Sequence, residues 1–169
     1  MTAVDRSLAS PTSTVSDSTF STAALTVLAT TDIHGHVFDW DYFADAAFPP
    51  SDKGRSSAPL GVSRVATIAK QVRAEQGADS VVMLDNGDTI QGTPLTYLSA
   101  KQPEKLGHDE VMARAFNLVG YDAANIGNHE FNYGVAELFR YHNDLKAPLL
   151  CANVIDVKTG KPLTQGSLM

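Results

Sequence analysis

Short apolar runs that alternate with helix-patterned segments are the feature that most constrains the fold of this chain. The runs are brief and rich in Val, Leu, Ile and Ala, as buried strands are. The segments between several of them repeat apolar residues every three or four positions, which is typical of helices. The expected strands cover about residues 25–30, 80–84, 122–126 and 149–155, and the expected helices about 62–76, 109–118 and 135–145. This alternation predicts βαβ crossovers and an α/β fold with a largely parallel, covered sheet.

The remaining segments have the composition of loops. Residues 1–23 are rich in Ser, Thr and Ala and lack the basic start and apolar centre of a signal peptide, so we expect a disordered leader. The segment from about Asp32 to Leu60 contains several Pro and Gly residues and predicts a long loop. No apolar stretch approaches the roughly 20 residues that a membrane-spanning helix needs.

Charge and cysteine content exclude two further classes. The formal net charge is −6 and no cluster of Lys and Arg is present, which argues against binding a nucleic acid polymer. Small anionic substrates stay possible, because a bound metal ion can reverse the local field. Cys151 is the single cysteine, so no internal disulfide can form, and its apolar surroundings predict a buried side chain.

Three polar clusters each follow an expected strand. They are Asp32-Ile33-His34-Gly35-His36, Asp85-Asn86-Gly87-Asp88 and Gly127-Asn128-His129-Glu130. Ligand sites of α/β sheets form beyond the carboxyl ends of the strands, so we expect the clusters to converge at one edge. Alternation in an extended chain would place Asp32 and His34 on the same side, where a carboxylate and an imidazole suit a divalent transition metal. Each cluster alone also fits a plain loop, turn or helix cap.

Together, the order Asp-x-His, Gly-Asp and Gly-Asn-His-Glu resembles the calcineurin-like metallophosphoesterase family. The surrounding residues resemble its 5'-nucleotidase group, and within that group most of all the 2',3'-cyclic-nucleotide 2'-phosphodiesterase/3'-nucleotidase enzymes. The segments that carry this likeness are 30–34, 39–42, 85–92, 127–134 and 153–156. The resemblance implies a metallophosphoesterase αββα sandwich represented by its first half only. Residues 24–169 would then be the N-terminal part of a catalytic domain whose C-terminal part and nucleotide-binding domain are absent.

The resemblance also implies a role for each polar residue. Asp32 and His34 would bind one metal ion, Asp88 would bridge two, and Asn128 would bind the second. His129 would be the catalytic histidine, and Asn128 and His129 would contact the substrate. Two divalent ions are implied, drawn from Zn, Mn, Mg, Co or Fe. A bridging carboxylate holds two such ions roughly 3.5–4 Å apart, and a positioned histidine can donate a proton to the leaving oxygen.

Two departures from the family pattern matter. Many 5'-nucleotidases have Asp where this chain has Asn132, and an amide orients an imidazole without stabilising its charged form as well, so the partner of His129 stays open. Asn at this position favours the cyclic-phosphodiesterase branch. The family also takes further histidine ligands from a second half of the domain, and nothing after Pro148 resembles them. We therefore expect a fragment of a longer enzyme that is inactive alone.

The resulting expectation is a metal-dependent phosphoester hydrolase that acts on nucleotides. The alternatives are a 5'-nucleotidase or UDP-sugar hydrolase, and a non-catalytic binding module that retains half of the site. The expected partner is a nucleotide substrate, with no transmembrane segment and an open oligomeric state. Related enzymes are typically periplasmic, attached to the cell wall or extracellular, but the first residues carry no export signal, so the localisation is left open.

Overall fold

A computed structural model describes residues 23–48 and 60–164 of the chain. The expected leader and residues 49–59 of the expected long loop lie outside these ranges. The strands of the main sheet are β1 (Thr26–Thr30), β2 (Val81–Asp85), β3 (Ala123–Asn125) and β4 (Leu149–Leu150). They lie side by side in the order β1-β2-β3-β4, and every neighbouring pair is parallel. The predicted α/β fold with a parallel sheet is therefore confirmed.

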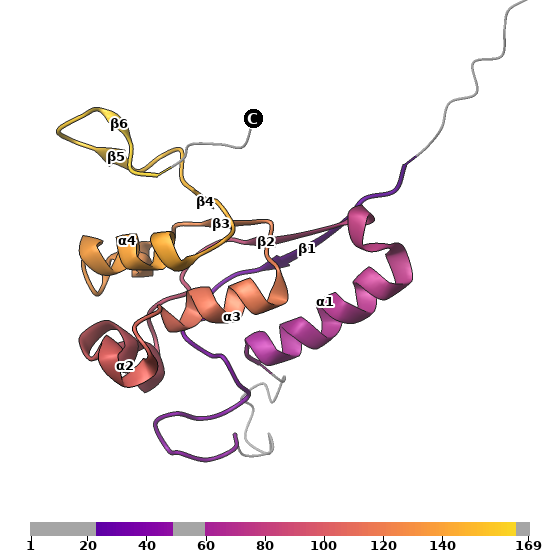
Figure 1. Cartoon of the computed structure of the whole chain (residues 1–169), viewed down its shortest axis with the longest axis horizontal. Coiled ribbons are helices and arrows are strands. Elements are labelled where there is room, and N and C mark those ends of the chain that lie inside the picture. The colour runs from indigo at the N-terminus through magenta and orange to yellow at the C-terminus, as the bar shows by residue number, and fades with distance from the viewer. Residues whose placement is uncertain (1–22, 49–59, 165–169) are drawn as a thin grey trace, which may run out of the picture.

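Four α-helices accompany the sheet in the described residues. They are α1 (Val62–Gln76), α2 (Pro94–Lys101), α3 (Val111–Val119) and α4 (Val135–Asp144). Figure 1 shows α1 and α3 on the same side of the strands, and α3 also contacts α2 and α4. None of these helices is long and apolar enough to cross a membrane. The sequence did not predict α2, whose start is fixed by Thr93, since the Thr93 hydroxyl accepts the Thr96 N–H at 3.3 Å.

The core lies between the helices and the sheet, with α3 at its centre. Phe116 of α3 is fully buried and stacks on Tyr121, with ring centroids 3.9 Å apart. The helix begins at Val111 rather than Asp109, because the buried Glu110 accepts the Ala113 N–H at 2.7 Å and acts as its N-cap. It ends at Val119, and the next residue, Gly120, caps it with a φ of 77°, which suits glycine.

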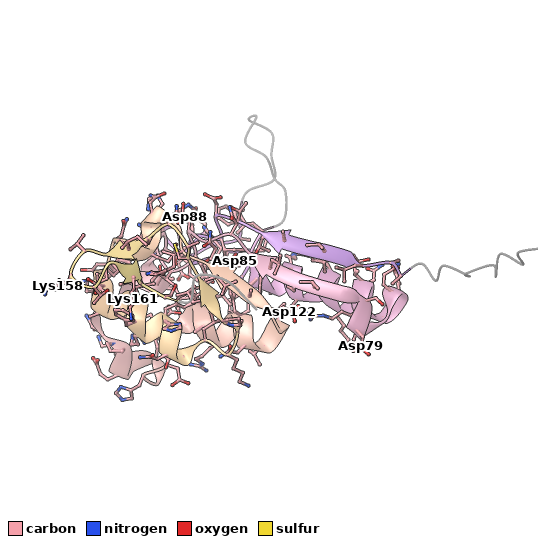
Figure 2. All side chains as sticks on the ribbon, turned by 90° about the horizontal axis from the view of Figure 1, so that it is seen from above. Asp79, Asp85, Asp88, Asp122, Lys158 and Lys161 are labelled. Carbon is pink, nitrogen blue, oxygen red and sulfur yellow. The ribbon has the colours of Figure 1, made fainter. Side chains whose placement is uncertain are left out.

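The other face of the sheet is left open by the described helices. Val27 of β1 is 55% exposed although it lies in the middle of a strand. A hollow of about 570 Å³ lies over the strands, lined by residues that include Ala29, Leu84, Ala123 and Leu150. Figure 2 looks down on this side of the molecule. The described residues therefore form a sheet with helices on one face.

The expected fourth strand, 149–155, is wrong beyond Leu150. β3 has only three residues, so the register of β4 ends where Asn125 pairs with Leu150. The chain then bends, and β5 (Ile155–Asp156) pairs antiparallel with β6 (Lys161–Pro162) in a separate hairpin. Asp156 closes its turn, since its side chain accepts the Lys158 N–H at 2.7 Å.

Candidate metal centre

The three polar clusters meet at the carboxyl ends of β1, β2 and β3, as the sequence predicts. Beyond the end of β1, backbone hydrogen bonds continue its pairing with the segment after β2. Asp32 N–H donates to Gly87 O at 3.0 Å, and His34 N–H donates to Asp88 O at 3.0 Å. Figure 2 places Asp85 and Asp88 together, far from Asp79 at the opposite end of β2. The first two clusters therefore form one continuous edge.

Glycines allow the loops to pack backbone against backbone. A Cβ on Gly127 would lie 2.2 Å from Asp88 Oδ1, and a Cβ on Gly92 would lie 2.5 Å from His34 O. Both distances are shorter than van der Waals contact. A side chain at either position would force the loops apart.

Three of the expected ligands have an unusual backbone. Asp32, His34 and Asp88 have φ values of 55°, 48° and 59°, in a region that non-glycine residues rarely adopt. Such conformations cost on the order of 1–3 kcal/mol each and cluster at functional sites. They also correct one expectation: Asp32 and His34 meet on the same side through left-handed turns and not through extended alternation. The distance from Asp32 Oδ1 to His34 Nε2 is 3.7 Å.

Potential metal-ligating atoms of His34, Asp88 and His129 gather at this edge. One such atom from each residue lies within 4.8 Å of the other two. His34 Nδ1 lies 3.0 Å from the carbonyl oxygen of Gln91, which can only accept, so Nδ1 carries the proton and Nε2 keeps its lone pair. An outer hydrogen bond of this kind is usual for metal-binding histidines. Imidazole nitrogen and carboxylate oxygen together suit a divalent transition metal, so the residues present fit such an ion.

His129 has a hydrogen-bond partner, which the sequence left open. Asn132 Nδ2 lies 3.1 Å from His129 Nδ1, and an amide nitrogen can only donate. Nδ1 therefore accepts, and in the neutral ring the proton sits on Nε2. In this tautomer Nε2 is a hydrogen-bond donor and not a metal ligand. The hydrogen bond thus distinguishes His129 from His34.

The remaining expected ligand, Asn128, lies next to this cluster along the chain. It is the first residue of the 3₁₀ helix η3 (Asn128–Phe131) and is exposed. Its backbone follows Gly127, which packs against Asp88. Asn128 therefore lies at the same edge, where it is exposed to solvent.

Asp85 organises the turn that carries Asp88. Its carboxylate accepts hydrogen bonds from the Thr30 hydroxyl at 2.7 Å, the Thr89 hydroxyl at 2.9 Å and the Gly87 N–H at 3.0 Å. Burial raises the pKa of Asp85 to about 6, and these hydrogen bonds oppose that rise. These contacts orient the loop that carries Asp88. The sequence did not single out Glu130 or Gln91, although the spacing of Glu130 from Gly127 matches a capping box.

Known proteins share this sequence and this fold. No protein-family model matches the chain. A 2',3'-cyclic-nucleotide 2'-phosphodiesterase/3'-nucleotidase of Yersinia enterocolitica is 42% identical over 156 residues, which are 92% of this chain and 22% of that protein. An enzyme of the same name from Salmonella typhimurium is 38% identical over 84% of this chain and 20% of its own length. The crystal structure of the calcineurin-like phosphoesterase YfkN from Bacillus subtilis matches with a TM-score of 0.70 and 32% identity, over 83% of this chain and 40% of that one. The chain thus spans about a fifth of the length of the two sequence relatives.

Proposed function

Because the chain is homologous to part of the calcineurin-like metallophosphoesterases of the 5'-nucleotidase group, we propose that it contributes the first metal-binding loops of a nucleotide phosphoester hydrolase. The observation that carries this proposal is the convergence of His34, Asp88 and His129 from three loops. Residues 24–169 would form the first part of the catalytic domain. A nucleotide would be the substrate.

A 2',3'-cyclic nucleotide is the substrate we favour, since both sequence relatives carry that name. Attack by water would open the cyclic phosphate to a 3'-nucleotide, and a second hydrolysis would release the nucleoside and phosphate. A 5'-nucleotidase or UDP-sugar hydrolase would use the same chemistry on another phosphoester. Asn132, where many 5'-nucleotidases have Asp, supports the cyclic-phosphodiesterase branch.

The roles proposed for the site residues come from the resemblance, and the distances between the side chains support them. Bound divalent ions would supply a hydroxide at neutral pH and would offset charge on the phosphoryl oxygens. Asp32 and His34 Nε2, 3.7 Å apart, would hold one ion. Asp88 would bridge to a second ion held by Asn128. His129, with its proton on Nε2, would donate a hydrogen bond to the phosphate and then a proton to the leaving oxygen, an effect typically worth about 10²–10⁴-fold.

The number of protein ligands in this chain limits how many metal ions it can hold and whether it is active. The described residues supply four candidate protein ligands, namely Asp32, His34, Asp88 and Asn128. Two closed metal sites need more ligands than these. We therefore propose that the 169-residue chain alone holds one cation weakly and does not turn over. In the protein at its full natural length, additional ligands would complete a two-metal site.

A phosphate-release assay tests the function. The full-length protein should hydrolyse 2',3'-cyclic AMP and 3'-AMP with Mn²⁺ or Zn²⁺ present and should lose this activity on chelation. Preference for 5'-AMP or a UDP-sugar would shift the assignment to the other branch. Absence of any metal-dependent phosphate release, with metal bound, would support the non-catalytic binding module. Rapid turnover by the 169-residue chain, on the order of 1 s⁻¹ or faster, would contradict the proposed incomplete site.

A further inference from the structure

Glu130 is a fully buried carboxylate between two of the site loops. Its side chain is 0% exposed. Oε2 accepts the N–H groups of Asp88 at 2.8 Å and Gly127 at 2.6 Å, and Oε1 accepts those of Thr89 and Ile90. Three of these donors belong to the loop after β2, and the fourth belongs to the loop after β3. One carboxylate therefore joins two loops that come from different strands.

The three consecutive donors after β2 form a site for an anion. Gly87 and Asp88 both have positive φ, and turns of this kind aim successive N–H groups at one point. Glu130 occupies that point. None of the ion pairs among the described residues involves Glu130, so the four N–H groups are what compensates its charge. A neutral side chain of the same shape would not satisfy the same donors.

A second hydrogen bond joins the same two loops, with its acceptor in the Asp88 loop. Asp88 Oδ1 accepts the N–H of His129 at 2.9 Å. Glu130 thus holds the Asp88 backbone, while the Asp88 side chain holds the backbone of the residue next to Glu130. This reciprocal pair fixes the position of Asp88 relative to His129. It also leaves Asp88 Oδ2 for a cation.

We propose that Glu130 is a positioning residue of the metal centre, which presents Asp88 and His129 to the cation as one rigid unit. This inference rests on the proposed function, because it assigns Glu130 to a site that binds metal. It carries a consequence for the substrate. Since Glu130 already accepts the N–H groups of residues 88–90, the phosphate of a nucleotide cannot bind to these three donors.

Glu130→Gln is the test substitution. Whichever oxygen the amide NH₂ replaces, two backbone N–H groups then face another donor. We expect Mn²⁺ affinity of the 169-residue chain to fall at least 10-fold, measured by isothermal titration at a temperature where circular dichroism shows the variant fully folded. Amide hydrogen exchange at Asp88, Thr89 and Gly127 should also become faster. Glu130→Asp, which keeps the charge but is one methylene shorter, serves if the amide variant does not fold.

Glu137→Gln is the matched control. Glu137 is also a buried glutamate, but it pairs with Arg140 on α4, where the two side chains approach to 2.6 Å. The Glu137→Gln variant should lose stability and keep its Mn²⁺ affinity. This result would separate positioning of the site from general support of the fold. Unchanged Mn²⁺ affinity and amide protection in both Glu130 variants would overturn the inference and leave the proposed function intact. A wild-type chain that binds no Mn²⁺ would instead overturn the proposal that this chain holds a cation by itself, and the exchange data would still show whether Glu130 joins the loops.

Discussion

The imidazole rings of His34 and His129 meet edge to face, with their centroids 5.0 Å apart and their planes at 74°. They reach this arrangement from loops that follow β1 and β3, the two neighbours of β2 in the sheet. Asp88, from the loop after β2, lies within reach of both. The order of strands in the sheet therefore accounts for the meeting of these three side chains.

Asp88→Asn should lower Mn²⁺ affinity at least 10-fold without unfolding the chain. The amide oxygen can still accept the His129 N–H, but the amide nitrogen then replaces the carboxylate oxygen that faces the cation. Isothermal titration and circular dichroism measure the two properties. Asp79→Asn is the control, because Asp79 lies at the other end of β2, in the 3₁₀ helix η1 (Ala78–Ser80), and undergoes the same change of charge. Equal affinity in the two variants would contradict the role of Asp88.

Asn132→Asp should reverse the tautomer of His129. Asn132 donates to Nδ1, whereas a carboxylate can only accept, so Nδ1 would carry the proton and Nε2 would become a possible ligand. The ¹⁵N chemical shifts of the ring nitrogens distinguish the tautomers. His142 on α4 is the internal reference and should not change. The same His129 tautomer in both proteins would mean that Asn132 does not set the proton position.

Gly127→Ala should disturb the metal centre, whereas Gly134→Ala should not. A Cβ on Gly127 would meet Asp88 Oδ1 at 2.2 Å, but a Cβ on Gly134 would meet nothing within 4 Å. Gly134 has φ 93° and ψ 161°, a region almost restricted to glycine, so alanine there costs on the order of 1–3 kcal/mol of backbone strain alone. We expect both variants to melt at lower temperature, with a loss of Mn²⁺ affinity confined to Gly127→Ala. An equal loss in both would show that general destabilisation is the cause.

Glu110→Gln should make stability less dependent on pH. Burial raises the pKa of Glu110 from the ordinary 4.5 to about 8. Between these values the folded state holds a proton that the unfolded state has released, so the stability of the wild type falls as the pH rises from about 4.5 to about 8. The raised pKa of Asp85 acts in the same direction, up to about pH 6.

Glutamine at position 110 does not ionise, so the variant should gain stability relative to the wild type as the pH rises. The gain at pH 8 should be at most on the order of a few kcal/mol. Urea unfolding at several pH values measures it. The control is Glu104→Gln in the 3₁₀ helix η2 (Pro103–Leu106), where the side chain is exposed. A constant difference between Glu110→Gln and the wild type from pH 5 to pH 8 would contradict this account.

The sequence predicted those parts of the fold that depend on local periodicity. The expected helix 62–76 coincides with α1, and the three longer strands lie within one or two residues of their expected positions. The sequence did not predict α2, because that helix is marked by a cap formed by Thr93 and Thr96 and not by an apolar stripe. It also extended β4 too far, because the length of that strand is limited by its partner β3 and not by its own residues.

At the site too, features that depend on nearby residues could be predicted, and features that depend on contacts between distant segments could not. The expected residues could be found because each cluster directly follows a strand, and parallel strands end at one edge. The left-handed backbone of Asp32, His34 and Asp88 was not predictable, since it depends on contacts between loops. The contacts of Glu130 were equally hidden, because its donors Asp88, Thr89 and Ile90 lie about forty positions earlier in the chain.

The strand pairs of the sheet join segments of different sequence separation, from which we infer an order of assembly. β3 pairs with β4 through Ala124 and Leu149, and β2 pairs with β3 through Leu84 and Ala123, whereas β1 pairs with β2 through Thr26 and Val81, across the longest stretch of chain. Closing a longer loop costs more entropy and slows folding. We therefore expect β1 to dock last. Asp88 and His129 would then already be joined when His34 arrives, so a cation present during folding would be captured at the final step and would slow the departure of β1.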